Sequence, residues 1–206
     1  MSSHSPKSIS PGCYGGKPTG DCPPKVEGAL DSYGAIVRDY VKRYRDRFEA
    51  NLRFYAELPS LEEAVKQAAL GKRPDGKRNS HQRRIPQESL QASARRLRRC
   101  NLAAGESFHQ LWEQVNDKIR GIDRIGELTI YDTAHRIGAF LKLHPELVYL
   151  HAGARIGAAT LGIPKPTAWA APTDLPKPFH KLTPAQMEDC LCIYKERLKA
   201  IQAAKR

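Results

Sequence analysis

Apolar side chains recur at intervals of three and four residues along most of this chain, and this spacing constrains the fold more than any other feature. The clearest run covers Asp31 to about Leu58, where Tyr, Ile, Val, Phe and Leu residues form one stripe and charged residues form the other face. We interpret the aromatic members as core rather than as a platform for stacking bases. No segment alternates convincingly with a period of two. The sequence therefore predicts an all-α fold, a single domain of about six or seven helices.

Residues that begin or end helices divide the rest of the chain into shorter expected helices. Pro59 ends the first helix, Ser60 with Glu63 forms a capping box for the next, and Gly71 stops that helix. We expect further helices from Pro86, over Glu106–Ile119, over Leu128–Leu141, from Pro145 and from Pro184. Prolines exclude a helix between residues 162 and 182. Two glycines at 153 and 157 are interpreted as a point of close helix packing, with a close approach to a ligand as the alternative.

Composition suggests where the ordered domain begins. Residues 1–25 are rich in Ser, Pro and Gly and predict a flexible head, followed by a helical domain over 26–206. The chain shows no long apolar run and no signal peptide, so we expect a cytoplasmic protein that does not enter a membrane. Its five cysteines form no CxxC pair, and we expect no metal and no cofactor. The oligomeric state is left open.

Positive charge is concentrated in one segment. The formal net charge is +12, and between Lys72 and Arg99 ten basic residues face two acidic ones, leaving +8 in that segment. Such a localised excess predicts a surface for a polyanion, and duplex DNA is the expected partner. The expected phosphate contacts here are Lys77, Arg78, His81, Arg83, Arg84, Arg95 and Arg99. A solvated basic face, or an adaptor surface for an acidic protein, is the alternative.

A short turn between two expected helices carries two glycines. Within Ile119–Leu141, Gly121 and Gly126 lie among isoleucines that pin the turn, an arrangement that suits a tight hairpin. The pattern resembles the helix-hairpin-helix element of DNA-binding proteins, with Arg124 at the position of the first glycine. That resemblance implies that the backbone amides of Gly126 and its neighbours bind a DNA phosphate, helped by Arg120 and Arg124. An ordinary helix turn is the alternative.

A second resemblance concerns the residues after the turn. Tyr131-Asp132-Thr133 is similar to a motif of helix-hairpin-helix DNA glycosylases, which are all-α hydrolases of DNA repair. The resemblance implies a base-processing enzyme that uses Asp132, and we take His151 of the next expected helix as its candidate partner. Leu128 stands near the place of the lysine nucleophile of that family, so lyase chemistry is not implied.

Four polar residues on the two neighbouring helices extend this hypothesis. Asp132 and Arg136 are four residues apart, as are His151 and Arg155. If the helices pack antiparallel, the four side chains converge, activate a water and hold a phosphate or base. We therefore include Arg136 and Arg155 among the expected DNA contacts. A buried polar network that locks the helices together is the alternative.

Overall fold

The computed structural model describes residues 29–79, 82–102, 106–164 and 168–204, and it confirms the all-α class. The described residues form seven helices, because α1, η1 and α2 run on as one. The α-helical segments are α1 (Tyr33–Tyr40), α2 (Asp46–Ala56), α3 (Leu61–Ala69), α4 (Gln87–Leu97), α5 (Phe108–Ile119), α6 (Glu127–Leu141), α7 (Ala152–Thr160) and α8 (Pro184–Ala203). The predicted flexible head lies outside the described residues.

The first helix is a long rod with a change of pitch in its middle. Between α1 and α2 lies the π-helical segment η1 (Val41–Arg45), so the helix is continuous from Tyr33 to Ala56. A π turn holds more residues than an α turn and therefore rotates the apolar stripe around the axis. As a result, α1 buries Tyr40 in one hydrophobic cluster and α2 buries Tyr55 in another.

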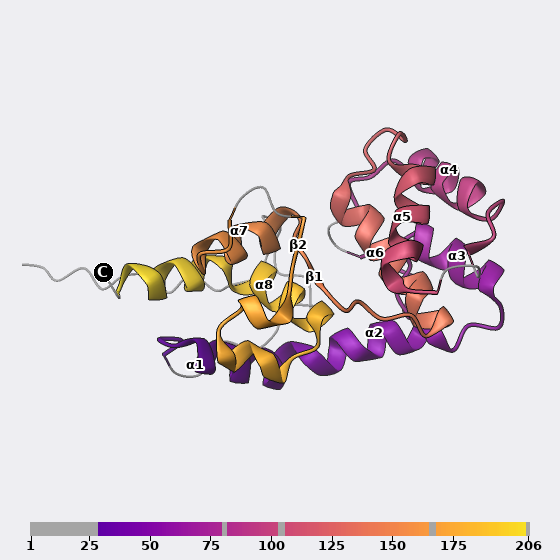
Figure 1. Cartoon of the computed structure of the whole chain (residues 1–206). Coiled ribbons are helices and arrows are strands. Elements are labelled where there is room, and N and C mark those ends of the chain that lie inside the picture. Colours follow the sequence, from indigo (N-terminus) through magenta and orange to yellow (C-terminus); the bar gives the residue numbers. More distant parts are fainter. Residues whose placement is uncertain (1–28, 80–81, 103–105, 165–167, 205–206) are drawn as a thin grey trace, which may run out of the picture.

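Two lobes form around these clusters, one at each end of the rod (Figure 1). In the first lobe, α3 and α6 pack against each other and α6 also packs on α2, while α4 lies between α3 and α5. In the second lobe, α7 packs along α8, and α8 lies against α1. None of the described helices has the length and apolar character needed to cross a membrane.

The prediction of a helix that begins at Pro145 is wrong. Residues Val148–Tyr149 form strand β1 instead, paired antiparallel with β2 (Trp169–Ala170), and α7 begins only at Ala152. A β-branched and an aromatic residue favour the extended form, whose side chains alternate between faces. Val148 accordingly packs in the cluster of the second lobe and Tyr149 in that of the first. The two-residue strand thus joins the two cores.

The predicted helix boundaries are otherwise close to the observed ones. The Ser60 hydroxyl accepts a hydrogen bond from the Glu63 amide at 3.2 Å, and Gly71 follows α3 with a positive φ of 64°. Thr183 and Gln186 form a reciprocal capping box at the start of α8. Among the described residues between 162 and 182 there are only β2 and two short 3-10 segments, η4 (Pro172–Asp174) and η5 (Lys177–Lys181).

The glycines of α7 confirm the packing interpretation. A Cβ on Gly153 would lie 2.6 Å from the Cys192 Sγ, and one on Gly157 would lie 2.5 Å from the Leu191 carbonyl oxygen. Both distances are shorter than van der Waals contact, so α8 approaches the α7 backbone directly. A backbone oxygen has little freedom to move away, which makes Gly157 the stricter of the two positions.

We predict that Gly157→Ala lowers the free energy of unfolding by about 1–3 kcal/mol, because α7 and α8 must separate to admit the methyl group. Gly121→Ala is the matched control, since nothing lies within 4 Å of a Cβ at that position. Urea unfolding of both variants measures the difference. Equal effects of the two substitutions would contradict the close approach of α7 and α8.

Candidate nucleic-acid interface

Helix α4 presents its arginines to solvent because its apolar residues occupy the opposite face. Leu90, Ala94 and Leu97 are buried at helical spacing against the first-lobe core. Ser93 lies on the same buried side, where its hydroxyl donates to the Ser89 carbonyl at 2.9 Å. The four remaining positions of the last turns are all exposed arginines, namely Arg95, Arg96, Arg98 and Arg99.

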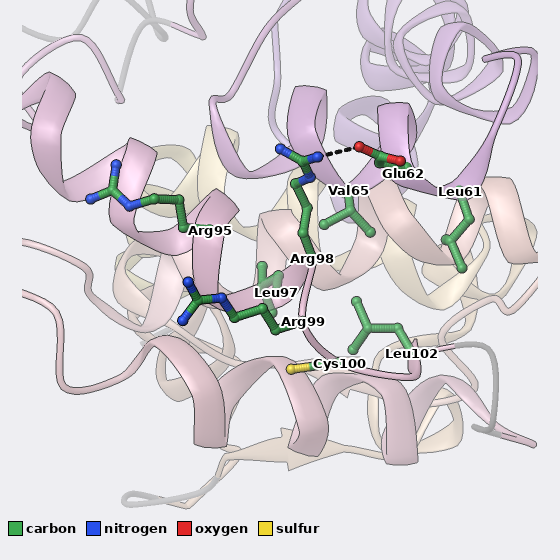
Figure 2. Close-up of a pocket in the computed structure, with 9 residues that line it drawn as sticks. All are labelled: Leu61, Glu62, Val65, Arg95, Leu97, Arg98, Arg99, Cys100 and Leu102. Atoms are coloured by element: carbon green, nitrogen blue, oxygen red, sulfur yellow. Dashed lines mark hydrogen bonds and ion pairs between the residues drawn. The ribbon is translucent and has the colours of Figure 1, made fainter.

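These four arginines differ in their partners. Arg98 forms an ion pair with Glu62 of α3, whereas Arg95 and Arg99 extend away from that pair (Figure 2). Within the described residues, the Arg95 and Arg99 guanidiniums make no ion pair or hydrogen bond. Together with Leu61 and Leu102 they line a groove of about 480 Å³ between α3 and the end of α4. Two arginines at this groove are therefore available to an external anion.

The end of α5 adds further cations. Arg96 donates through Nη1 to the Lys118 carbonyl at 3.2 Å, which brings the last turns of α4 and α5 together. Arg120 follows directly as the C-cap of α5. We call the resulting surface the basic edge, defined by the exposed residues Arg95, Arg96, Arg99, Lys118 and Arg120. Asp117 contributes one carboxylate on the same turn of α5, so the surface stays strongly positive.

The loop before α4 is structured and uses several of its own cations. The backbones of Lys72 and Arg78 form an isolated antiparallel bridge, and the Arg73 side chain forms an ion pair with Asp75 at 2.6 Å. Arg78 also donates through Nη1 to the Ile85 carbonyl at 3.0 Å. A phosphate contact is therefore not supported for Arg78, because its guanidinium is bound within the protein. The exposed cations of this loop are Lys77, Arg83 and Arg84.

The turn between α5 and α6 carries balanced charge. Gly126 is the exposed N-cap of α6, and Arg120 and Arg124 are exposed in the same turn. Arg124 has a φ of 60°, in the left-handed region that glycine favours, at the position where the resemblance has its first glycine. Asp123 and Glu127 offset the two arginines, so residues 120–127 have no net charge. This turn attracts a phosphate less strongly than the basic edge does.

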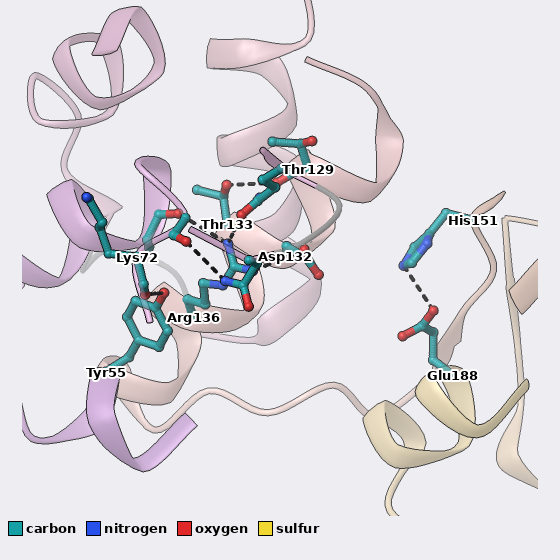
Figure 3. Close-up of polar contacts among 12 residues, drawn as sticks. Tyr55, Lys72, Thr129, Asp132, Thr133, Arg136, His151 and Glu188 are labelled. Carbon is teal, nitrogen blue, oxygen red and sulfur yellow. Dashed lines mark hydrogen bonds and ion pairs between the residues drawn. The ribbon is translucent and has the colours of Figure 1, made fainter. Parts of the chain in front are cut away.

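Arg136 is buried, and its expected role in DNA binding is corrected. Its side chain is 5% exposed, and its guanidinium donates to Gln82 Oε1 at 3.0 Å and to Asp132 Oδ2 at 3.1 Å (Figure 3). It also donates to the Ala68 carbonyl at 3.4 Å and lies over the Tyr55 ring, 5.8 Å from the centroid. Arg136 is a buried cross-link of the first lobe.

His151 lies beside Glu188 rather than beside Asp132. Its Nε2 is 3.4 Å from Glu188 Oε1, and its ring lies 4.7 Å from that of Tyr131. Burial, together with the Asp189 and Asp132 charges, raises the pKa of Glu188 well above its usual range. Figure 3 shows the Asp132 pair and the Glu188 pair at separate places. Asp132 thus pairs with Arg136, whereas His151 lies against Glu188.

The remaining members of the expected site also have other roles or lie elsewhere. Arg155 is half-buried and donates to Glu127 at 2.8 Å and to the Leu150 carbonyl, so a phosphate contact is not supported for it. His81 lies outside the described residues. Each of the four polar residues thus makes a structural contact within the protein.

Sequence reasoning did not predict the burial of two polar residues, one on α6 and one on α8. Glu188 and His135 are nearly inaccessible, and burial lowers the pKa of His135 to about 4, so its imidazole is neutral at pH 7. One signal was available for Glu188, which lies three residues before Leu191 and therefore on the inner stripe of α8. His135 had a similar signal, because it lies one helical turn from Tyr131.

We predict that Arg136→Met lowers the free energy of unfolding by roughly 3 kcal/mol, because it leaves the Asp132 carboxylate and the Gln82 amide without their partner. Arg95→Met is the control, since an exposed site away from special features changes stability by about 0.5 kcal/mol or less. Guanidinium chloride unfolding measures both variants. A small effect at Arg136 would mean that the guanidinium is not the cross-link described above.

Known proteins offer no guide to this surface. Among the residues that the structure describes, no group of three or more His, Cys, Asp or Glu side chains is placed to hold a metal ion. Comparison with known proteins finds no matching family model, no matching curated protein and no matching solved structure. The chemistry of the surface must be judged from its own side chains, and exposed guanidinium groups dominate it.

Proposed function

We propose that this protein binds duplex DNA through the basic edge, with Arg83 and Arg84 as additional contacts. The observation that carries the proposal is the state of Arg95 and Arg99, which are exposed and make no side-chain hydrogen bond or ion pair within the described residues. A planar guanidinium matches the geometry of phosphate oxygens and binds them in a bidentate manner. A row of such groups releases counterions from DNA when it binds.

Cations of the second lobe lie beside carboxylates, which supports placing the DNA-binding surface on the first lobe. The exposed cations of the second lobe include Lys199, which pairs with Glu196 at 3.0 Å. Neighbouring carboxylates of this kind weaken the attraction for a polyanion. The favourable field is therefore expected on the first lobe, where α4 and α5 end together.

Base processing is not part of this proposal. Asp132 forms an ion pair with Arg136, and His151 lies against Glu188, so their described contacts are structural ones. Asp132 is partly exposed, but its carboxylate already accepts a charge-assisted hydrogen bond.

We predict that Arg95→Gln/Arg99→Gln weakens binding to a 20-base-pair duplex and flattens its salt dependence. Two lost phosphate contacts change the slope of log K against log salt by about 1.8, since each contact contributes about 0.9. Fluorescence anisotropy at several salt concentrations measures both quantities. Lys177→Gln/Lys181→Gln removes the same charge from η5 of the second lobe, where both lysines are exposed, and should change the slope little.

Equal losses of DNA affinity and of salt dependence in the two double variants would show that only the total charge matters. They would overturn the assignment of DNA binding to the basic edge. Absence of binding by the unmodified protein at about 50 mM salt would overturn DNA binding altogether. That result would favour an acidic protein as the partner of this surface. Thermal unfolding of both variants confirms that the fold is retained.

A further inference from the structure

One line of long polar side chains runs along the outward face of α4. Gln87, Gln91 and Arg95 are spaced four residues apart, which places them above one another on a helix. All three are exposed, and Glu88 and Arg98 flank the line. The buried face of α4 packs toward α3 and α5, so the exposed line faces away from the lobe.

We propose that α4 lies in the major groove of B-form DNA and contacts base edges through Gln91. This inference rests on the proposed DNA-binding function and extends it from phosphate contact to sequence recognition. A glutamine amide pairs in a bidentate manner with the N6 and N7 edge of adenine. On α4, Gln91 offers this amide one turn before Arg95, which contacts phosphate in the proposed function.

The dimensions of α4 fit such a position. Its 11 residues span about 16 Å, and the major groove is about 12 Å wide. Cations lie beyond both ends of the helix, with Arg83 and Arg84 before it and Arg99 after it. A helix that crosses the groove therefore brings cations to the phosphates on both sides.

The side-chain amides of Gln87 and Gln91 differ in the hydrogen-bonding groups that remain available. Arg78 donates through Nη2 to the Gln87 side-chain oxygen, which fixes that amide and leaves its NH₂ group as a donor. Gln91 makes no side-chain hydrogen bond within the described residues and keeps both its donor and its acceptor. Gln91 is therefore the residue suited to bidentate contact with adenine, while Gln87 is limited to acceptors such as a phosphate oxygen.

Other nucleic-acid modes fit the same face less well. The minor groove is about 6 Å wide and does not admit a helix of about 10 Å diameter. Binding of single strands uses aromatic side chains on which bases stack, and the exposed positions of α4 carry none. The polar line and the flanking arginines together favour the major groove.

Selection from a random duplex library tests the inference. The unmodified protein should enrich a short motif and bind a selected duplex at least fivefold more tightly than a scrambled one. The selected duplex is then made with 7-deazaadenine and 7-deazaguanine, which lack the N7 acceptor of the major groove but keep the phosphates and the minor groove. Affinity for this duplex should fall to nearly that for the scrambled sequence.

Variants assign the effect to α4. Gln91→Ala should reduce the preference for the selected duplex about 5- to 150-fold, the range expected for one bidentate pair, and leave affinity for the scrambled duplex within twofold. Arg84→Gln should weaken binding to both duplexes equally, as loss of a phosphate contact does. Gln202→Ala on α8 is the matched glutamine control and should change neither affinity.

The outcomes separate the two proposals. Binding without sequence preference, or a preference that survives 7-deaza substitution or Gln91→Ala, would overturn the assignment of α4 to the major groove while leaving phosphate contact intact. No binding to any duplex would overturn both. Loss of preference in Gln91→Ala with an unchanged thermal midpoint is the result that the arrangement of α4 predicts.

Discussion

The buried guanidinium of Arg136 is the constraint on which the first lobe depends. A charge in a protein interior is costly unless it is paired and hydrogen-bonded, and Arg136 meets this condition by drawing partners from four places. Asp132 lies on its own helix, Ala68 on α3, Gln82 in the loop before α4, and the Tyr55 ring on the rod. One side chain thereby holds together segments that are far apart in the sequence.

The position of α4 follows from this anchor. Gln82 is fully buried where Arg136 holds it, and α4 begins only a few residues later, after Pro86. The Tyr55 hydroxyl also donates to the Lys72 carbonyl, which fixes the start of the same loop. Because the loop is tied at both ends, α4 has a defined orientation, with its apolar stripe inward and its arginines outward. The buried contacts of Arg136 thus help to fix the position of the exposed arginines of α4.

Periodicity and capping were sufficient to predict most helices, because spacing, prolines and glycines act over a few residues. The strand at Val148–Tyr149 was not predictable in this way, since its partner lies about twenty residues later and periodicity does not report such pairing. For the same reason the sequence could not show that Arg136 is buried whereas Arg95 is exposed. Both are arginines on amphipathic helices, and only the distant Gln82 and Ala68 show that Arg136 is internal.

Hydrogen–deuterium exchange with and without duplex DNA tests the central claim most directly, which is that the external arginines of the first lobe form the binding surface. The account predicts slower exchange confined to residues 82–102 and 118–121, with α7 and α8 unchanged. Protection spread over the second lobe, or protection of the rod near α1 without change in α4, would contradict it.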